Sequence, residues 1–389
     1  MKRVLIWSNA PWTSTGYGQQ TNYLVKALNQ LGYHAAVLAN WGAEYAAQTW
    51  GEYDTVVYAK GFQRELGEDI LPFILAKEKP DLILTLCNEW TLNADWWGSL
   101  AAQHNAKLAC WSPVEQSPIP PKVKQWFETT NATIIPLTEA GRKEYQLAGF
   151  HTRNPVPHCI DTKIFQPKGR TLRPEMKISD KQTVFGMVGI NKGNYQIRKS
   201  FPQCFLAFKK FLDEEDEEAI LVLHTDTSPL MGGVDLPVLW RTIGIPDENI
   251  RVTPRVFQYD PMGLDKLAEL YRSFDVLLAP SMAEGFGIPV IEAQACGVPV
   301  ITNDWTAQPE LTFNGMQVDG ILHWDGIQGG WLKLPDPFLI YDAMLTLINC
   351  DKITKEKEAK LGIKNVQEFS FENVRETYFK PLFNSLFDG

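Results

Sequence analysis

Two glutamates, Glu284 and Glu292, flank a glycine turn that could bind a charged ligand. Four apolar residues just before the turn predict a buried strand, and Pro289 stands where a helix would begin. Gly285 and Gly287 allow the backbone to turn sharply and to approach a ligand closely. Because free backbone N–H groups and the positive end of a helix dipole meet at such a turn, the segment is suited to bind an anion.

The two carboxylates restrict what that anion can be. Carboxylates accept hydrogen bonds and repel phosphate, so a ligand at this turn must also offer hydroxyl groups. A sugar attached to a nucleoside diphosphate has both the phosphates and the hydroxyls. The alternative interpretation is that Glu284 is a solvated loop acid and that Glu292 is a helix-surface acid stabilised by the helix dipole.

A second loop carries cations that suit the same ligand. A strand predicted at 183–190 and a helix predicted from Phe201 enclose this loop, which contains Lys192, Arg198 and Lys199. Such cations can neutralise a diphosphate leaving group, and an arginine can hold two of its oxygens at once. Solvated loop cations are the alternative.

The chain opens with a strand, a glycine-containing loop and a helix, which is typical of a Rossmann-type unit. The strand is predicted at 3–8 and the helix at 20–31. Gly16, Tyr17 and Gly18 lie in the loop, but the third glycine and the acidic residue of a dinucleotide fingerprint are absent. An NAD-dependent oxidoreductase is therefore disfavoured.

Further apolar runs alternate with helical patterns, which predicts parallel sheets whose ligands gather at the carboxyl ends of the strands. Two polar loops should lie there, 88–90 and 111–116, and the second contains Glu115. A capping or solvated role for Glu115 is an equal alternative in this proline-rich loop. The other strands are predicted at 35–39, 55–59, 81–86, 107–112, 133–137, 219–225, 251–256, 276–279 and 300–303.

The stretch EGFGIPVIEAQACGVPVI, from 284 to 301, resembles the nucleotide-sugar signature of retaining GT-B glycosyltransferases of family 4, the glycosyl transferases group 1. The resemblance implies an α/β fold of two Rossmann-like domains that face each other across a cleft. It also implies that Glu284 contacts hydroxyls of the donor sugar and that Glu292 binds the ribose. The turn amides would hold the sugar and the phosphate: Gly285, Phe286, Gly287 and Ile288.

The same resemblance assigns roles outside the signature. It places the loop with Gly16, Tyr17 and Gly18 under the donor phosphates, and it matches Lys199 to the lysine of a Lys-Gly pair. The arginine that relatives carry earlier in this loop is absent, so Arg198 or Lys192 is a candidate substitute. Relatives often have His or Asp near the position of Glu115, which is a candidate catalytic group here. Further donor contacts are expected from Asn191, Thr225, Asp226, Val256 and Phe257.

The segment PVPHCIDTKIFQP, 155–167, resembles the family's exit from the first domain. The predicted domains are therefore 1–167, on the acceptor side, and 168–371, which binds the nucleotide sugar. The polar run 168–181 is the expected linker, and a final helix at about 372–389 is expected to pack back on the first domain. The segment 324–335, rich in Gly and Trp, has no interpretation from sequence.

Composition limits the class of protein. The chain has 389 residues, of which 44% are hydrophobic and 21% charged, and these values are typical of a globular protein of two domains. No apolar run approaches the ~20 residues of a membrane span, and the N-terminus does not resemble a signal peptide, so a cytoplasmic location is expected. The net charge of −9 makes a nucleic acid a less favoured acceptor. The cysteines are scattered and predict no metal site.

The residues favour transfer of a sugar from a nucleotide sugar of UDP or GDP type to a hydroxyl of a glycan, lipid or protein, and the resemblance implies a retaining glycosyltransferase. Neither a metal nor another cofactor is expected, because cations and backbone amides can stabilise the departing diphosphate. A nucleotide-sugar epimerase of the same fold and a non-catalytic nucleotide-sugar-binding protein are the alternatives. Nothing in the sequence fixes the donor sugar, the acceptor or the oligomeric state.

Overall fold

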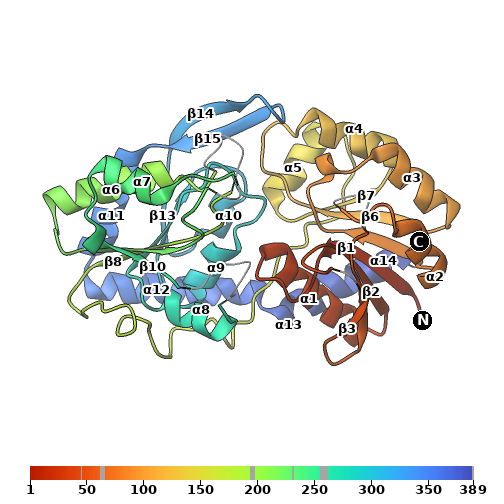
Figure 1. The fold of residues 1–389 in the computed structure, drawn as a ribbon, viewed down its shortest axis with the longest axis horizontal. Helices are drawn as coiled ribbons and strands as arrows, with labels where there is room; N and C mark the ends of the chain where they lie inside the picture. Colours follow the sequence, from red (N-terminus) through yellow and green to blue (C-terminus); the bar gives the residue numbers. More distant parts are fainter. Residues whose placement is uncertain (45, 62–65, 193–197, 230–231, 255–261, 388–389) are drawn as a thin grey trace. The chain divides into compact units, whose positions relative to one another are not determined.

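The computed structural model describes residues 1–389 except 45, 62–65, 193–197, 230–231, 255–261 and 388–389. The chain divides into two units, each with its own sheet and core (Figure 1). Unit 1 contains Met1–Cys159, Asp325–Gly330 and Phe371–Gly389, and unit 2 contains Ile160–Trp324 and Trp331–Ser370. The predicted α/β class with two Rossmann-like domains is confirmed.

Unit 1 is built on a seven-stranded sheet in the order β3-β4-β2-β1-β5-β6-β7. All neighbouring strands are parallel except β3 and β4, which are antiparallel. The central strands read as continuous apolar runs because both of their faces are buried. The strands are β1 (Arg3–Asn9), β2 (His34–Trp41), β3 (Gln48–Trp50), β4 (Thr55–Tyr58), β5 (Leu82–Thr85), β6 (Lys107–Ser112) and β7 (Thr133–Pro136).

Helices cover both faces of this sheet. Side chains of α2, α3, α4 and α5 share one apolar cluster with the sheet, in which Trp97, Trp126 and Tyr145 are fully buried, while α1 and α14 lie on the other side (Figure 1). The Trp111 ring contacts the Phe379 ring edge-on, so a segment near the end of the chain packs on strand β6 of this sheet. The helices are α1 (Gly16–Gln30), α2 (Leu71–Glu78), α3 (Ala94–Gln103), α4 (Pro121–Thr130), α5 (Glu139–Leu147), α13 (Phe371–Val374) and α14 (Lys380–Phe387).

Unit 2 has a six-stranded, all-parallel sheet in the order β10-β9-β8-β11-β12-β13. Its strands are β8 (Val184–Val188), β9 (Ile220–His224), β10 (Ile250–Val252), β11 (Val276–Ala279), β12 (Val300–Asn303) and β13 (Gly315–Val318). The point between β8 and β11 is where the strand order reverses, and ligands of such sheets bind at a crevice of this kind.

The helices of unit 2 also form two layers. Apolar side chains of α6, α7 and α11 pack on one face of the sheet, and α8, α9 and α12 lie on the other (Figure 1). The helices are α6 (Phe201–Glu214), α7 (Leu236–Ile243), α8 (Leu264–Tyr271), α9 (Ile288–Ala295), α10 (Gln308–Leu311), α11 (Pro337–Asn349) and α12 (Lys352–Val366). Among the described residues, no helix combines the length and the apolar character needed to cross a bilayer.

Several sequence expectations need correction. The segment 324–335 belongs to a hairpin of β14 (Gly320–Asp325) and β15 (Gly330–Pro335), whose tip is assigned to unit 1. The segment 168–181 is packed within unit 2 rather than being a free linker, since the Leu172 N–H donates to Ser273 Oγ at 2.7 Å and Arg173 pairs with Asp275. The first stretch of unit 1 ends at Cys159, whereas the sequence places the boundary after Pro167.

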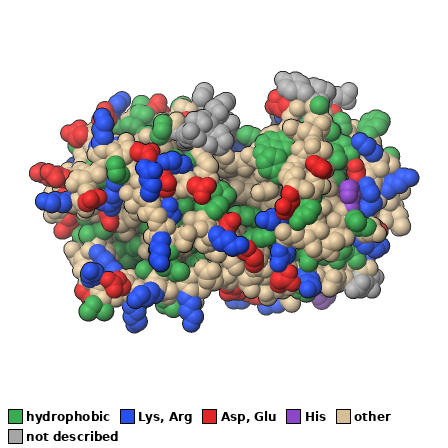
Figure 2. Space-filling view, turned by 90° about the horizontal axis from the view of Figure 1, so that it is seen from below, with side chains coloured by type: hydrophobic (Ala, Val, Ile, Leu, Met, Phe, Trp, Pro, Cys, Tyr) green, Lys and Arg blue, Asp and Glu red, His purple; other side chains and the backbone are tan. Residues whose placement is uncertain are grey.

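Charged side chains are mixed over the surface. Figure 2 shows Lys and Arg interspersed with Asp and Glu on the visible face of each unit, and the coloured residues there form no broad area of one sign. Binding to nucleic acid without sequence preference depends on clustered cations. The visible face therefore offers no such cluster, in keeping with the net charge of −9.

Candidate functional site

Glu284 stands at the centre of a charged cluster in unit 2. It lies in the turn between β11 and α9, where Lys199 Nζ donates to its Oε1 and Arg198 Nη1 donates to its Oε2 at 3.0 Å. Arg198 Nη1 also donates to the Ala283 carbonyl at 2.8 Å. Three of the four predicted catalytic residues therefore meet at one point, and Glu115 lies in unit 1.

The cluster carries an excess of positive charge. Burial alone would raise the pKa of Glu284, but the ion pairs with Lys199 and Arg198 outweigh burial and lower this pKa to about 2. Lys199 and Arg198 thus bring two cations to one ionised carboxylate. Glu284 is only 9% exposed, so the interpretation of it as a solvated loop acid is wrong.

The glycine turn beside this cluster has the backbone shape that the sequence predicts. Gly287 has φ +117° and ψ 56°, which an L-residue adopts only under strain, and it stands at the N-cap of α9. Gly287 has no side chain with which to cap this end of the helix, and Pro289 in its first turn has no N–H. The remaining N–H groups of the first turn are those that favour an anion.

Glu292, on α9, is the second carboxylate of the signature and is 2% exposed, which contradicts its interpretation as a surface acid. Its Oε2 accepts a hydrogen bond from the Tyr271 hydroxyl at 2.8 Å, and Oε1 has no hydrogen-bond partner among the described residues. Burial raises the pKa of Glu292 to about 8, and the Tyr271 hydrogen bond offsets only part of this shift. A buried carboxyl oxygen without a partner is suited to a ligand hydroxyl.

Changing Glu292→Gln is expected to change how stability depends on pH. The pKa of Glu292 is about 8 in the folded protein and 4.5 as the ordinary value of a glutamate. Between these two pH values the folded protein therefore keeps the proton that the unfolded chain has already lost. The group therefore contributes stability at low pH that is lost as the pH rises, by up to about 1.4 kcal/mol per pH unit. Urea unfolding of both proteins at pH 5 and 7.5 measures the difference. A difference that is the same at both pH values would contradict the raised pKa.

The other predicted donor residues of unit 2 differ in what the structure says of them. The Asn191 side chain bonds to the loop that follows β9, since Nδ2 donates to the Val234 carbonyl at 2.7 Å. Asp226 Oδ1 accepts from the N–H and the hydroxyl of Ser228 at 2.9 and 2.7 Å, and Thr225 is buried. These side chains shape loops at the carboxyl end of β9. Val256 and Phe257 lie outside the described residues.

Gly285, Phe286 and Ile288 are all buried. The Phe286 ring contacts the Phe369 ring edge-on, 5.7 Å between centroids, which fixes the turn against the end of unit 2. The backbone amides of these three residues, which are expected to hold the donor, therefore belong to a well-packed segment. Thr306 adds a further support that sequence did not indicate, because its Oγ1 accepts from the Glu284 N–H at 3.1 Å.

The N-terminal glycines of unit 1 lie in a helix rather than in a loop. Helix α1 begins at Gly16, four residues before its predicted start, because the Thr15 Oγ1 caps it by accepting from the Gly18 N–H at 3.0 Å. A Cβ on Gly18 would come within 2.6 Å of the Thr13 carbonyl oxygen, so glycine is needed for close packing there. The Tyr17 hydroxyl donates to Asn88 Oδ1 at 2.7 Å.

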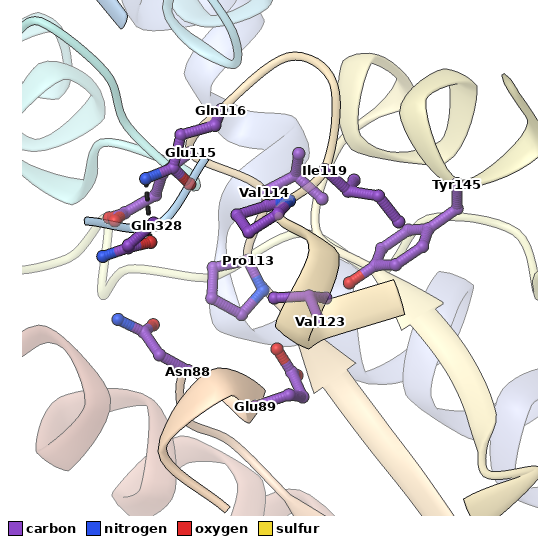
Figure 3. A pocket seen from close by; sticks show the side chains of 11 residues that line it. Asn88, Glu89, Pro113, Val114, Glu115, Gln116, Ile119, Val123, Tyr145 and Gln328 are labelled. Carbon is purple, nitrogen blue, oxygen red and sulfur yellow. Dashed lines mark hydrogen bonds between the residues drawn. The ribbon is translucent and has the colours of Figure 1, made fainter. Parts of the chain in front are cut away.

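Unit 1 has a pocket of its own at the carboxyl ends of β5 and β6, shown in Figure 3. Half-buried Glu115 lines it, together with Gln116, whose Nε2 donates to Gln328 Oε1 of the hairpin tip at 2.8 Å. Glu89 lies at the opposite side of the pocket, in the short helix η1 (Glu89–Thr91). The remaining lining residues are Asn88, Pro113, Val114, Ile119, Pro120, Val123 and Tyr145.

Sequence reasoning placed Glu89 in a loop, 88–90, expected at the ligand-binding edge of the sheet but gave it no role, and it missed Tyr271 and Gln328 as site residues. The sequence indicates a site role for Glu89, because it lies in the loop that follows a predicted strand of a parallel sheet. It gives no such indication for Tyr271 and Gln328, since each reaches its partner only through tertiary packing. Among the described residues, no group of three or more His, Cys, Asp or Glu side chains could hold a metal ion.

The chain is similar to known glycosyltransferases in part of its sequence and in its fold. Residues 207–348 match the family described as Glycosyl transferases group 1. The D-inositol 3-phosphate glycosyltransferase of Rhodococcus jostii is 30% identical over 224 residues, which are 54% of this chain and 47% of that protein. The chain spans less than half of the length of the curated relatives that it matches.

Solved structures show the fold over the whole chain. The sucrose-phosphate synthase of Thermosynechococcus elongatus superposes with a TM-score of 0.77 at 17% identity and covers 100% of both chains. Anabaena HepE in complex with UDP-glucose gives 0.72 at 14% identity, over 99% of this chain and 100% of that one. The fold of this protein is therefore the GT-B fold.

Proposed function

We propose that this protein is a retaining glycosyltransferase of family 4, which moves a sugar from a nucleotide-sugar donor to an acceptor hydroxyl. The observation that carries the proposal is the cluster of Glu284, Lys199 and Arg198 in the turn that leads into the amino end of α9. It combines two cations with a carboxylate that these cations hold ionised. A diphosphate and a sugar hydroxyl are the two groups that such a site accommodates together.

The donor would bind with its parts divided among these groups. Its diphosphate would bind to Lys199, Arg198 and the first backbone amides of α9. Glu284 would accept a hydrogen bond from a hydroxyl of the sugar. The ribose would lie at Glu292, where Oε1 has no partner among the described residues. UDP-sugars are the first donors to examine, because HepE is solved with UDP-glucose, and GDP-sugars are the second.

The reaction in this proposal needs no side-chain nucleophile. The acceptor oxygen forms a bond to the anomeric carbon on the face that the leaving group vacates, while the bond from that carbon to the phosphate oxygen breaks. The bonding electron pair passes to the diphosphate, where Lys199 and Arg198 stabilise it, and the acceptor proton passes to a leaving phosphate oxygen. Two cations and a helix end would stabilise the charge without a metal ion.

The comparisons support transfer more than the alternatives. The matching family model and the similar curated proteins describe glycosyltransferases. No observation favours the epimerase or the non-catalytic binding protein. An epimerase would need an acid and a base on either side of the sugar, and His158, in the segment 155–167, is 3% exposed with its ring against Trp111. Inositol 3-phosphate, which the names of curated relatives print, is one acceptor to test.

A thermal-shift screen over UDP-, GDP-, ADP- and dTDP-sugars tests the donor. A nucleotide sugar present at 100 times its Kd should stabilise the protein by about 2.7 kcal/mol. The products formed with and without an acceptor then distinguish the three candidate functions. A transferase forms product only with an acceptor, an epimerase converts the nucleotide sugar without one, and a binding protein forms no product. If no nucleotide sugar shifts the unfolding temperature, the proposed donor site is wrong.

A further inference from the structure

The pocket of unit 1 contains a buried acid that the proposed reaction does not use. Glu89 is 1% exposed, and its Oε1 has no hydrogen-bond partner among the described residues. The Ser112 side chain hydrogen-bonds to the Glu89 carboxyl group and is itself hydrogen-bonded to the Tyr145 hydroxyl. An unpartnered buried oxygen of this kind is costly unless a ligand completes its hydrogen bonding.

Figure 3 shows how Glu89 lies with respect to its neighbours. Its carboxyl group points up toward Pro113 and Val123, into the space that the pocket occupies, rather than back into the sheet. Burial raises the pKa of Glu89 to about 8, so at neutral pH the group is largely protonated and can both donate and accept. That is the behaviour needed to bind a hydroxyl group.

The lining of the pocket excludes a phosphate. Its described residues include two acids, Glu89 and Glu115, and three amides, Asn88, Gln116 and Gln328, but no lysine or arginine. A phosphate placed here would meet carboxyl groups without a cation to neutralise it, which is unfavourable in a partly buried site. Amides and a protonated carboxyl, by contrast, match the mixed donors and acceptors of hydroxyl groups.

The size of the pocket agrees with its chemistry. The cavity volume is about 20 Å³, and one water molecule needs roughly 10–15 Å³ on this measure. The enclosed space therefore has room for a group the size of one hydroxyl or hydroxymethyl. The hairpin tip closes one side of this space through the Gln116–Gln328 hydrogen bond.

We infer that this pocket selects the acceptor: it receives an unphosphorylated, hydroxyl-bearing part of a polyol or sugar, and Glu89 Oε1 binds one of its hydroxyl groups. The inference rests on the proposed function, because it specifies the acceptor class of the same reaction. Glu89 acts as a specificity-determining residue, with Gln328 of the hairpin tip on the rim of the same pocket.

The test measures binding to the full chain by isothermal titration with two pairs of probes, inositol with inositol 3-phosphate and glucose with glucose 6-phosphate. An unphosphorylated member should bind at least about 10-fold more tightly than its phosphorylated partner. Glu89→Leu should weaken that binding about 10- to 100-fold, the effect of one strong hydrogen bond, whereas the isosteric Glu89→Gln should stay within a few-fold of the parent. The matched control is Glu128→Leu, at an exposed glutamate on α4.

A second variant keeps the inference testable if Glu89→Leu does not fold. Gln328→Lys places a cation at the rim and should improve binding of the phosphorylated probes by about 10-fold. The inference is overturned if phosphorylated probes bind the parent protein better, if Glu89→Leu binds like the parent, or if neither unphosphorylated probe binds. These outcomes leave the donor screen unaffected, so a failure here is distinguishable from a failure of the proposed function.

Discussion

Replacing Lys199 with alanine should lower kcat/KM for sugar transfer by about 100- to 1,000-fold, the usual effect of removing one group that stabilises developing charge in a transition state. Lys199 Nζ contacts Glu284 in the donor cluster, and in the proposed reaction this cation stabilises the departing diphosphate. The fold should persist, because Arg198 still pairs with Glu284 at 3.0 Å. Initial rates with the donor found in the screen give the comparison.

The matched control for this variant is Lys210→Ala. Lys210 lies on α6, a few residues further along the chain, and pairs with Glu214 on the helix surface. Its removal should leave the rate within about twofold, since surface pairs contribute little. A Lys199→Ala protein that unfolds at the parent's temperature and transfers sugar at the parent's rate would rule out the role assigned to Lys199.

Gly287→Ala should both destabilise unit 2 and weaken nucleotide-sugar binding. The φ of +117° lies where alanine is strained, and such strain costs about 1–3 kcal/mol. Crowding adds little, because a Cβ at this position would meet no atom closer than 3.6 Å. The turn can relieve the strain only by shifting the first amides of α9, so we expect at least a 10-fold loss of affinity. Urea unfolding and the thermal shift with the nucleotide sugar measure the two effects.

Gly263→Ala is the matched glycine change in the same unit. Gly263 is the N-cap of α8 with φ −62°, and a Cβ there would enter open space. The free energy of unfolding should change by less than about 1 kcal/mol, and donor binding should not change. Equal stability of the two variants would show that the backbone at Gly287 is not constrained as the structure has it.

The sequence was sufficient for the parts of the site that depend on local chain geometry. Strand β11, the turn at Gly287 and helix α9 follow one another directly, so proline and glycine positions locate them within one or two residues. Lys199 and Arg198 were predicted for the same reason, as cations between a strand and a helix. The burial of Glu292 was not predicted, because it depends on α8, which supplies Tyr271.

Other parts of the structure are set by contacts between distant residues. The edge strand β3 is three residues long and exposed, so it has neither an apolar run nor a clear alternation. In the hairpin, β14 is mostly exposed and carries glycine and histidine, which sequence patterns do not assign to a strand. Gln116 and Gln328 are 212 residues apart, and only tertiary structure brings their side chains together.

The composition of unit 1 from three stretches of chain has a consequence for fragments of this protein. Synthesis reaches Phe371 only after all of unit 2 has been made, so the ring of Phe379 arrives late to cover Trp111. A polypeptide cut after Cys159 would lose the ring of Phe379 that packs on that indole and would lack the glutamine that Gln116 contacts. Expression of the N-terminal half alone should yield an aggregating product, and adding the peptide 371–389 in trans should restore part of its solubility.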